Sequence, residues 1–180
     1  MRSVARKIAL AGILTALALA LSIAERWIPL GLLIPVPGVR LGLANVVTMF
    51  ALFYLGPVYA GSILVVRCTL AALFTGITAF PFSIAGGVLA YAVMLALKQG
   101  YGRSFSLFGV SMGGAVAHNV GQVAIASLML GEVMLFTYLP ALMLIGLATG
   151  ILTAAVSIPL FRVLDKSGLA SRYIPLKRKV

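Results

Sequence analysis

The sequence is poor in acidic residues, and this scarcity limits the chemistry that the chain can perform. Among 180 residues there are three Asp and Glu residues, one His and one Cys, and only 9% of the residues are charged. A multi-histidine metal site, a Ser-His-Asp set, a paired-carboxylate motif and a phosphate-binding Gly-Lys-Ser loop need residues that the chain does not offer at the required spacing. We therefore expect no catalytic residue, no bound metal and no cofactor, so the protein is not predicted to be an enzyme.

The single cysteine and the low share of charged residues exclude further kinds of protein. Cys68 lies in an apolar run and cannot form an internal disulfide, so we expect it to be a small core residue. Soluble domains usually carry about 25% charged residues. This chain is instead 62% hydrophobic, with a mean hydropathy of +1.16. At roughly 20 apolar residues per membrane helix, the composition predicts an all-α, polytopic membrane protein.

The basic residues predict how the chain is oriented in the membrane. The formal net charge of +11 would point to nucleic acid in a soluble protein, but here the basic residues gather at the two ends and in one internal loop. Because positive charge marks cytoplasmic loops and favours anionic lipid, we expect six crossings in the cell membrane of a bacterium or archaeon, with both ends inside. The clusters are Arg2, Arg6 and Lys7; Lys98 and Arg103; and Arg162, Lys166, Arg172, Lys177, Arg178 and Lys179.

The hydropathy pattern divides the chain into one transmembrane bundle over residues 1–165 and a basic cytoplasmic tail over 166–180. Residues 28–39 contain three prolines and two glycines, which break helices, so we predict an outer loop there and a lid or ligand-site wall over 28–40. An alternative for the N-terminal run is a secretory signal cleaved near Ala18-Leu19-Ala20, although the run is longer than a typical signal core. The helices are expected at about 7–24, 41–55, 57–74, 81–97, 105–130 and 138–164.

Arg67 is the most informative charged residue, because it falls inside a predicted membrane helix. An arginine near a helix centre costs about 2.5–3.5 kcal/mol and needs a partner or an aqueous cavity. We expect Glu25 and Glu132 at the outer edge, which leaves no carboxylate at the depth of Arg67. Arg67 could extend outward and bond carbonyls or one of these glutamates. Alternatively, Arg67 and Arg40 could together bind a carboxylate or phosphate.

The fifth predicted helix contains the densest polar and glycine-rich stretch of any crossing. Gly114, His118 and Gln122 share one face, so two hydrogen-bonding side chains lie beside a gap that a ligand could occupy. A hydrogen bond between helices is an equally good interpretation of His118. Asn45 and Thr48, three residues apart, could join the same polar pocket. The candidate orienting groups are Asn45, His118, Asn119 and Gln122, and the candidate anion contacts are Arg40 and Arg67.

The first predicted helix carries small residues at intervals of four. Such a face lets another helix approach closely, either within the bundle or from a partner subunit. Spacing alone favours packing within the bundle, because alanine is common in membrane helices. The positions are Gly12, Ala16, Ala20 and Ala24.

Three stretches resemble the Gx transporter family, which is also labelled heptaprenyl diphosphate synthase component I. They are PVPGVRLGLANVVT over residues 35–48, Arg67, and GVSMGGAVAHNVGQ over residues 109–122, within a resemblance that covers about residues 5–165. The family is similar to the substrate-binding S components of energy-coupling-factor transporters. The resemblance implies a six-helix bundle that binds a solute near the outer face. It also implies docking through small residues of the first helix onto a transmembrane T component that carries two ATP-binding cassette ATPases.

Three functions remain as hypotheses from the residues and the resemblance. The first is an S-component-like subunit that captures a small anionic or amphipathic solute and passes it to a T component with ABC ATPases. The second is a noncatalytic membrane subunit for polyprenyl diphosphate or quinone metabolism, since the carboxylates that would hold magnesium diphosphate are missing. The third is a membrane partner in flavin- or quinone-linked electron transfer.

Overall fold

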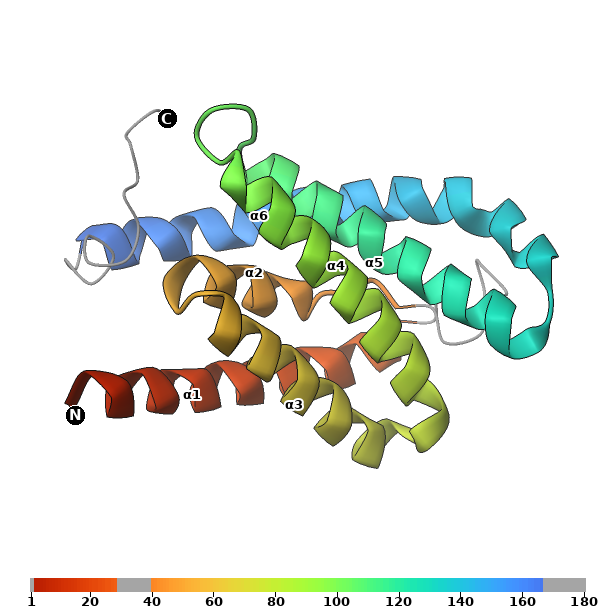
Figure 1. Ribbon diagram of the computed structural model, residues 1–180, viewed down its shortest axis with the longest axis horizontal. Helices are drawn as coiled ribbons and strands as arrows, with labels where there is room; N and C mark the ends of the chain where they lie inside the picture. Colours follow the sequence, from red (N-terminus) through yellow and green to blue (C-terminus); the bar gives the residue numbers. More distant parts are fainter. Residues whose placement is uncertain (1, 29–39, 167–180) are drawn as a thin grey trace.

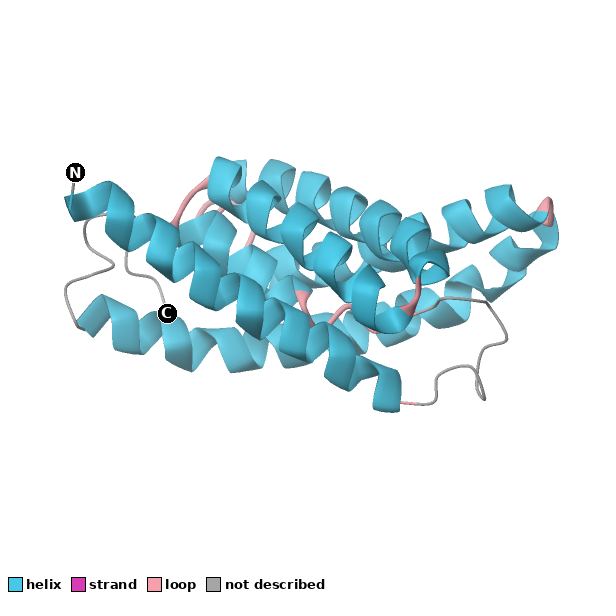
Figure 2. Ribbon diagram, turned by 90° about the horizontal axis from the view of Figure 1, so that it is seen from below, coloured by secondary structure: helices cyan, strands magenta, loops and turns pink. Residues whose placement is uncertain are grey.

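The computed structural model describes residues 2–28 and 40–166, and their regular structure is entirely helical (Figure 2). The predicted all-α fold is therefore confirmed. Short 3-10 helices precede or follow the α-helices at three connections, namely η1 (Glu25–Trp27), η3 (Ile77–Ala79) and η4 (Val133–Tyr138). The α-helices are α1 (Arg2–Ala24), α2 (Asn45–Tyr54), α3 (Pro57–Thr75), α4 (Phe80–Gln99), α5 (Leu107–Leu130) and α6 (Leu139–Lys166).

Five of these helices, all except α2, are long and apolar enough to cross a membrane, so the chain is a polytopic membrane protein. The prediction of a helix over 41–55 is wrong at its start, because Gly42 has a φ of 76° and α2 begins only at Asn45. With 10 residues, α2 is about 15 Å long, roughly half of the hydrocarbon thickness. A helix of this length does not span the membrane by itself, and nonhelical backbone next to such a helix is tolerated where it is buried in protein.

The helices run back and forth along the long axis of the molecule (Figure 1). The start of α1, the α2–α3 turn, the α4–α5 loop and the end of α6 lie towards the left of that view. The end of α1, the α3–α4 turn and the α5–α6 turn lie towards the right. The described basic clusters therefore gather at one end, as the positive-inside pattern requires. The predicted lid falls mostly on residues 29–39 and the predicted tail mostly on residues 167–180, both outside the described residues.

A turn and a hydrogen bond fix the C-terminal end of the short helix α2, at the end of the bundle that carries the basic clusters. Gly56, with a φ of 95°, turns the chain so that α3 can begin at Pro57, a residue suited to a first helical position. The Nζ atom of Lys98, on α4, donates a 2.7 Å hydrogen bond to the carbonyl oxygen of Leu52. Because the last carbonyls of a helix have no partner within the helix, this bond caps the C-terminal end of α2.

Glycines bring α4, α5 and α6 into backbone contact. A Cβ atom at Gly121 would lie 2.8 Å from the carbonyl oxygen of Ala85 on α4, and one at Gly150 would lie 2.6 Å from the Cα atom of Met112 on α5. In a membrane the hydrophobic effect does not drive helices together, because lipid is as apolar as their side chains. Close packing of this kind therefore holds the helices together. These three helices therefore form one tightly packed half of the bundle. The helices α1, α2 and α3 pack against this half and enclose the polar interior with it.

Candidate anion-binding site

Glu25, in η1 directly after α1, lies at the end of the bundle where we expected it, but it is buried between helices and not exposed at the membrane surface. Its side chain is only 4% exposed. The Oε1 atom accepts hydrogen bonds from the backbone N–H groups of Gly42 and Leu43, the latter at 3.3 Å. These two N–H groups belong to the turn that leads into α2, so Glu25 connects the end of α1 to the start of α2.

A repeated pattern in α1 could have predicted this position. The buried residues of that helix are Leu14, Ala18 and Ser22, and Glu25 continues the same face three residues later. Its charge and the nearby Trp27, which is 86% exposed, favour an exposed position for Glu25 at the membrane surface. The periodicity was the better guide, because a short 3-10 helix prolongs α1 by one turn.

Arg67 lies on α3 with a side chain that is only 4% exposed, so it does not extend outward to the membrane surface. Its Nη1 atom donates a 3.1 Å hydrogen bond to the Oγ atom of Ser22. Its Nε and Nη2 atoms are buried and have no hydrogen-bond partner within the described part of the chain. These two nitrogens form one edge of the guanidinium group, the edge that can donate two parallel hydrogen bonds to a carboxylate or phosphate.

Arg40 is half-buried beside the same interior. Its Nη2 atom donates to the Oγ1 atom of Thr75 at 3.3 Å, and its backbone N–H donates to the Oε1 atom of Gln122 at 3.2 Å. Burial lowers the pKa of the Arg40 guanidinium, while the negative charge of Glu25 acts in the opposite direction. Arginine stays protonated in proteins, so Arg40 contributes a positive charge.

Three charges thus meet where η1, the segment before α2 and α3 come together. The positive charges of Arg40 and Arg67 both act on the carboxylate of Glu25. The expectation that no carboxylate compensates Arg67 is therefore wrong, because the buried Glu25 acts on it. Glu25 compensates one of the two arginines, and the described cluster keeps one surplus positive charge.

The polar face of α5 closes the cluster from the other side. His118 is 3% exposed and Gln122 is fully buried. The His118 ring lies against the backbone of Gly42 and Gly86, since a Cβ atom at either glycine would lie 2.9 Å from a ring atom. Neither ring nitrogen has a hydrogen bond of ordinary geometry to a described residue, although the ring lies close to the carbonyl of Gly86.

Asn45 completes the group of predicted residues that the fold brings together. A Cβ atom at Gly42 would lie 2.7 Å from its Nδ2 atom, and both polar atoms of the Asn45 amide lack a partner among the residues described. The Oγ1 atom of Thr48, one turn further along α2, is buried in the same way. The residues that meet here are Arg40, Asn45, Arg67, His118 and Gln122.

Asn119 is the predicted site residue that the structure places elsewhere. Its Nδ2 atom donates a 2.6 Å hydrogen bond to the carbonyl oxygen of Leu142 on α6. One residue along a helix rotates the side chain by about 100°, so Asn119 faces α6 while His118 faces the charged cluster. Asn119 therefore links two helices.

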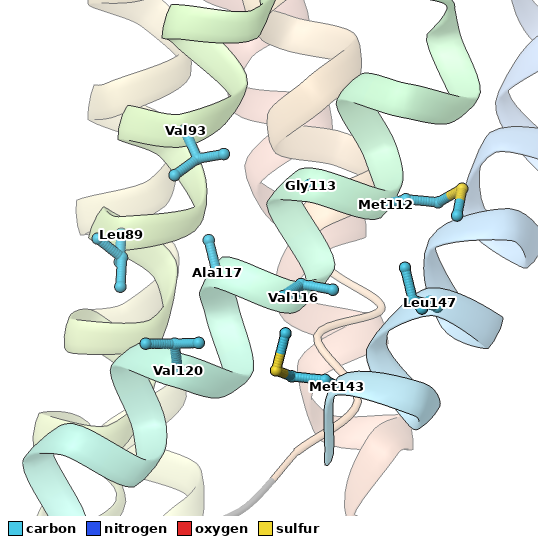
Figure 3. A pocket seen from close by; sticks show the side chains of 9 residues that line it. All are labelled: Leu89, Val93, Met112, Gly113, Val116, Ala117, Val120, Met143 and Leu147. Carbon is cyan, nitrogen blue, oxygen red and sulfur yellow. The ribbon is translucent and has the colours of Figure 1, made fainter. Parts of the chain in front are cut away.

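An apolar groove lies on the opposite face of α5 from His118 (Figure 3). It has a volume of about 520 Å³ and is bordered by side chains of α4, α5 and α6. Its lining has no charged residue, so it does not form part of the charged cluster. The residues are Leu89, Val93, Met112, Gly113, Val116, Ala117, Val120, Met143 and Leu147.

The small residues of α1 do not pack within the bundle, contrary to what their spacing alone favoured. All four positions are exposed, and a Cβ atom at Gly12 would meet no atom within 4 Å. They lie opposite the buried face that carries Ser22. This leaves docking of a partner as the remaining prediction for Gly12, Ala16, Ala20 and Ala24.

Comparison with known proteins places the chain in one family. The family model described as heptaprenyl diphosphate synthase component I matches residues 14–160. No curated protein and no solved structure matches the chain.

Proposed function

The chain belongs to the heptaprenyl diphosphate synthase component I family, and we propose that it is a noncatalytic membrane subunit that binds the anionic head of a small amphiphile. The family description names component I of a synthase. A first component implies a second one, and this supports the proposal that another protein is its partner. That partner, a soluble prenyl synthase, would supply the carboxylates that hold a magnesium diphosphate. The membrane subunit would hold the amphiphile, with its chain among the apolar helices and its anionic head at the charged cluster.

The unpartnered edge of Arg67 is the observation that carries this proposal. A buried polar group without a hydrogen bond is destabilising, and a buried guanidinium is more so. The Nε and Nη2 atoms of Arg67 are buried donors without acceptors among the described residues, and they are spaced to match two oxygens of one anionic group. The binding of such a group would satisfy both donors and would neutralise the surplus positive charge.

The test compares Arg67→Met with Arg26→Met in protein reconstituted into lipid nanodiscs. Arg26 is an exposed arginine at the same end of the bundle, bonded to the carbonyl oxygen of Phe74 at 3.3 Å, so its variant controls for the loss of a charge. The probes are geranic acid, geranyl phosphate and geranyl diphosphate, which share one hydrocarbon chain. We expect at least one probe to bind the wild type, with an affinity at least about tenfold lower in Arg67→Met, which corresponds to about 1.4 kcal/mol.

Two results would overturn the proposal. One is that no probe binds the wild-type protein, and the other is that Arg67→Met binds as tightly as Arg26→Met. Native mass spectrometry of the purified wild type would add independent support if it finds a retained anionic molecule that Arg67→Met lacks.

A second candidate function is favoured by the exposed small-residue face of α1. In this alternative the protein is the S-component-like subunit of an energy-coupling-factor type transporter, and Gly12, Ala16, Ala20 and Ala24 dock onto a T component that carries ABC ATPases. The four exposed positions allow the close approach that such docking needs.

Copurification from the native membrane distinguishes the two candidates. A T component with ATPases supports transport, and a soluble prenyl synthase supports the synthase subunit. Ala16→Leu should reduce recovery of a T component, whereas Ala148→Leu, the same change at an exposed position of α6, should not. Equal recovery with both variants would argue against docking through α1.

A further inference from the structure

Glu25 determines how much charge remains for a ligand at the cluster. It is buried, and its Oε1 atom accepts hydrogen bonds from Gly42 and Leu43, two and three residues after Arg40. Arg67 is bonded to Ser22, three residues before Glu25, so the three charged side chains lie in one region of the bundle. No charged residue occurs in the sequence between Trp27 and Arg40, so the intervening segment cannot alter this balance. Arg26 also acts on Arg40, but Arg26 is exposed, where solvent screens its charge.

We infer that Glu25 selects for a ligand head with a single negative charge, a carboxylate, over phosphate monoesters and diphosphates. This inference rests on the proposed binding of an anionic amphiphile at Arg67. Two arginines and one glutamate leave one positive charge, which one carboxylate neutralises. A head with two or more charges would leave uncompensated negative charge in a medium of low dielectric constant, where such charge is strongly unfavourable.

The orientation of Arg67 agrees with a planar head. Ser22 holds the Nη1 atom at 3.1 Å, so the guanidinium presents its Nε and Nη2 edge as a fixed pair of donors. The two coplanar oxygens of a carboxylate accept two parallel hydrogen bonds from such an edge. The other polar side chains at the cluster add no positive charge that a second ligand charge would need. Asn45 and Gln122 are uncharged amides, and burial beside two arginines disfavours the charged form of the His118 imidazole.

Glu25→Gln isolates the charge from the hydrogen bonds. The glutamine Oε1 atom can still accept from the N–H groups of Gly42 and Leu43, while the negative charge is removed. The cluster would then hold two surplus positive charges and would favour a doubly charged head. Glu132→Gln is the matched control, because Glu132 is an exposed glutamate at the same end of the bundle.

The experiment measures the affinities of geranic acid, geranyl phosphate and geranyl diphosphate for the full chain in nanodiscs at neutral pH. We expect the wild type and Glu132→Gln to bind geranic acid at least about tenfold more tightly than geranyl phosphate, a difference of about 1.4 kcal/mol. In Glu25→Gln that ratio should fall at least about tenfold. Butyrate and dodecanoate, added as competitors, distinguish a soluble carboxylate from a lipid carboxylate, and competition by either supports the inference.

The possible failures separate this inference from the proposed function. Absence of binding by all probes overturns both. Tighter binding of the phosphate or diphosphate by the wild type overturns the inference alone, as does an unchanged ratio in Glu25→Gln. If Glu25→Gln does not fold, the ranking of the three probes by the wild type decides the question.

Discussion

Ser22 shows how a single residue supports the charged cluster. Its Oγ atom accepts a hydrogen bond from Arg67, and its O–H group donates one to the carbonyl oxygen of Ala18 at 2.9 Å. It is buried on the face of α1 that continues to Glu25. One small side chain thus links α1 to α3 and sets the orientation of the guanidinium.

Ser22→Ala should lower the free energy of unfolding by about 1–3 kcal/mol, because a third nitrogen of the buried guanidinium loses its partner. Thermal unfolding in detergent measures this effect. Ser62→Ala is the control, because Ser62 is an exposed serine of α3 bonded only to the carbonyl oxygen of Val58. Equal unfolding temperatures for the two variants would show that the Ser22 bond contributes nothing.

Asn119→Ala should reduce stability by about 0.6 kcal/mol and by at most about 1.7 kcal/mol, the range for hydrogen bonds between membrane helices. The reason is the loss of the bond to Leu142 on α6. Binding of the geranyl probes should stay unchanged, whereas Asn45→Ala should weaken it. A loss of probe binding in Asn119→Ala at unchanged stability would contradict the assignment.

The sequence predicts some of these residues and misses others for physical reasons. Arg67 can be found because a charge inside a membrane helix is costly and therefore rare. The burial of Glu25 is harder to predict, because its charge favours an exposed position although the periodicity of α1 indicates a buried one. Asn119 follows His118 in the sequence, but one residue along a helix turns its side chain towards α6.

At the scale of helices, the contact between α4 and α5 depends on the absence of a side chain. A Cβ atom at Gly121 would lie 2.9 Å from the Cα atom of Gly86 and 2.8 Å from the carbonyl oxygen of Ala85. These are backbone atoms and cannot move aside as the end of a side chain could. The packing of His118 and Gln122 against Gly86 depends on the same close approach.

Gly121→Ala should therefore separate α4 from α5 and cost about 1–3 kcal/mol of stability, the usual penalty of overpacking. Gly109→Ala on the same helix is the control, because its Cβ atom would meet Phe105 at 3.6 Å, an ordinary contact distance. Thermal unfolding of both variants in detergent is the measurement. A Gly121→Ala variant as stable as the wild type would refute the proposed contact.

Most helices could be predicted from their apolar runs, but the start of α2 could not. Long runs bounded by proline, glycine or basic residues gave the other five to within a few residues at most ends. The run from Leu41 also reads as helical, yet the positive φ of Gly42 and the bonds from its turn to Glu25 keep the first four residues out of α2. This is a tertiary effect that local sequence does not contain.

For the whole molecule, the alternation of helix directions predicts opposite sides of the membrane for Arg103 and Glu132. Both residues are exposed; Arg103 belongs to the α4–α5 loop and Glu132 to the α5–α6 turn, and these two connections lie at opposite ends of the bundle (Figure 1). In a Cys68→Ser background, Glu132→Cys should react with a membrane-impermeant maleimide in intact cells. Arg103→Cys should react only after permeabilisation.

The wild type is the control for this labelling, because its one cysteine, Cys68, is buried at 1% exposure and should not react. Labelling of both introduced cysteines from the same side would contradict the orientation that the basic clusters predict.

The glycine contacts of α4, α5 and α6 also restrict how the protein can be redesigned. Where backbone meets backbone, no larger residue can be introduced, so the α5 side of the cluster offers little freedom for reshaping. Variants intended to accept a bulkier molecule should change residues on the α2 side, such as Thr48, whose hydroxyl has no hydrogen-bond partner among the described residues. A library for altered specificity should therefore concentrate its diversity there and leave the glycines unchanged.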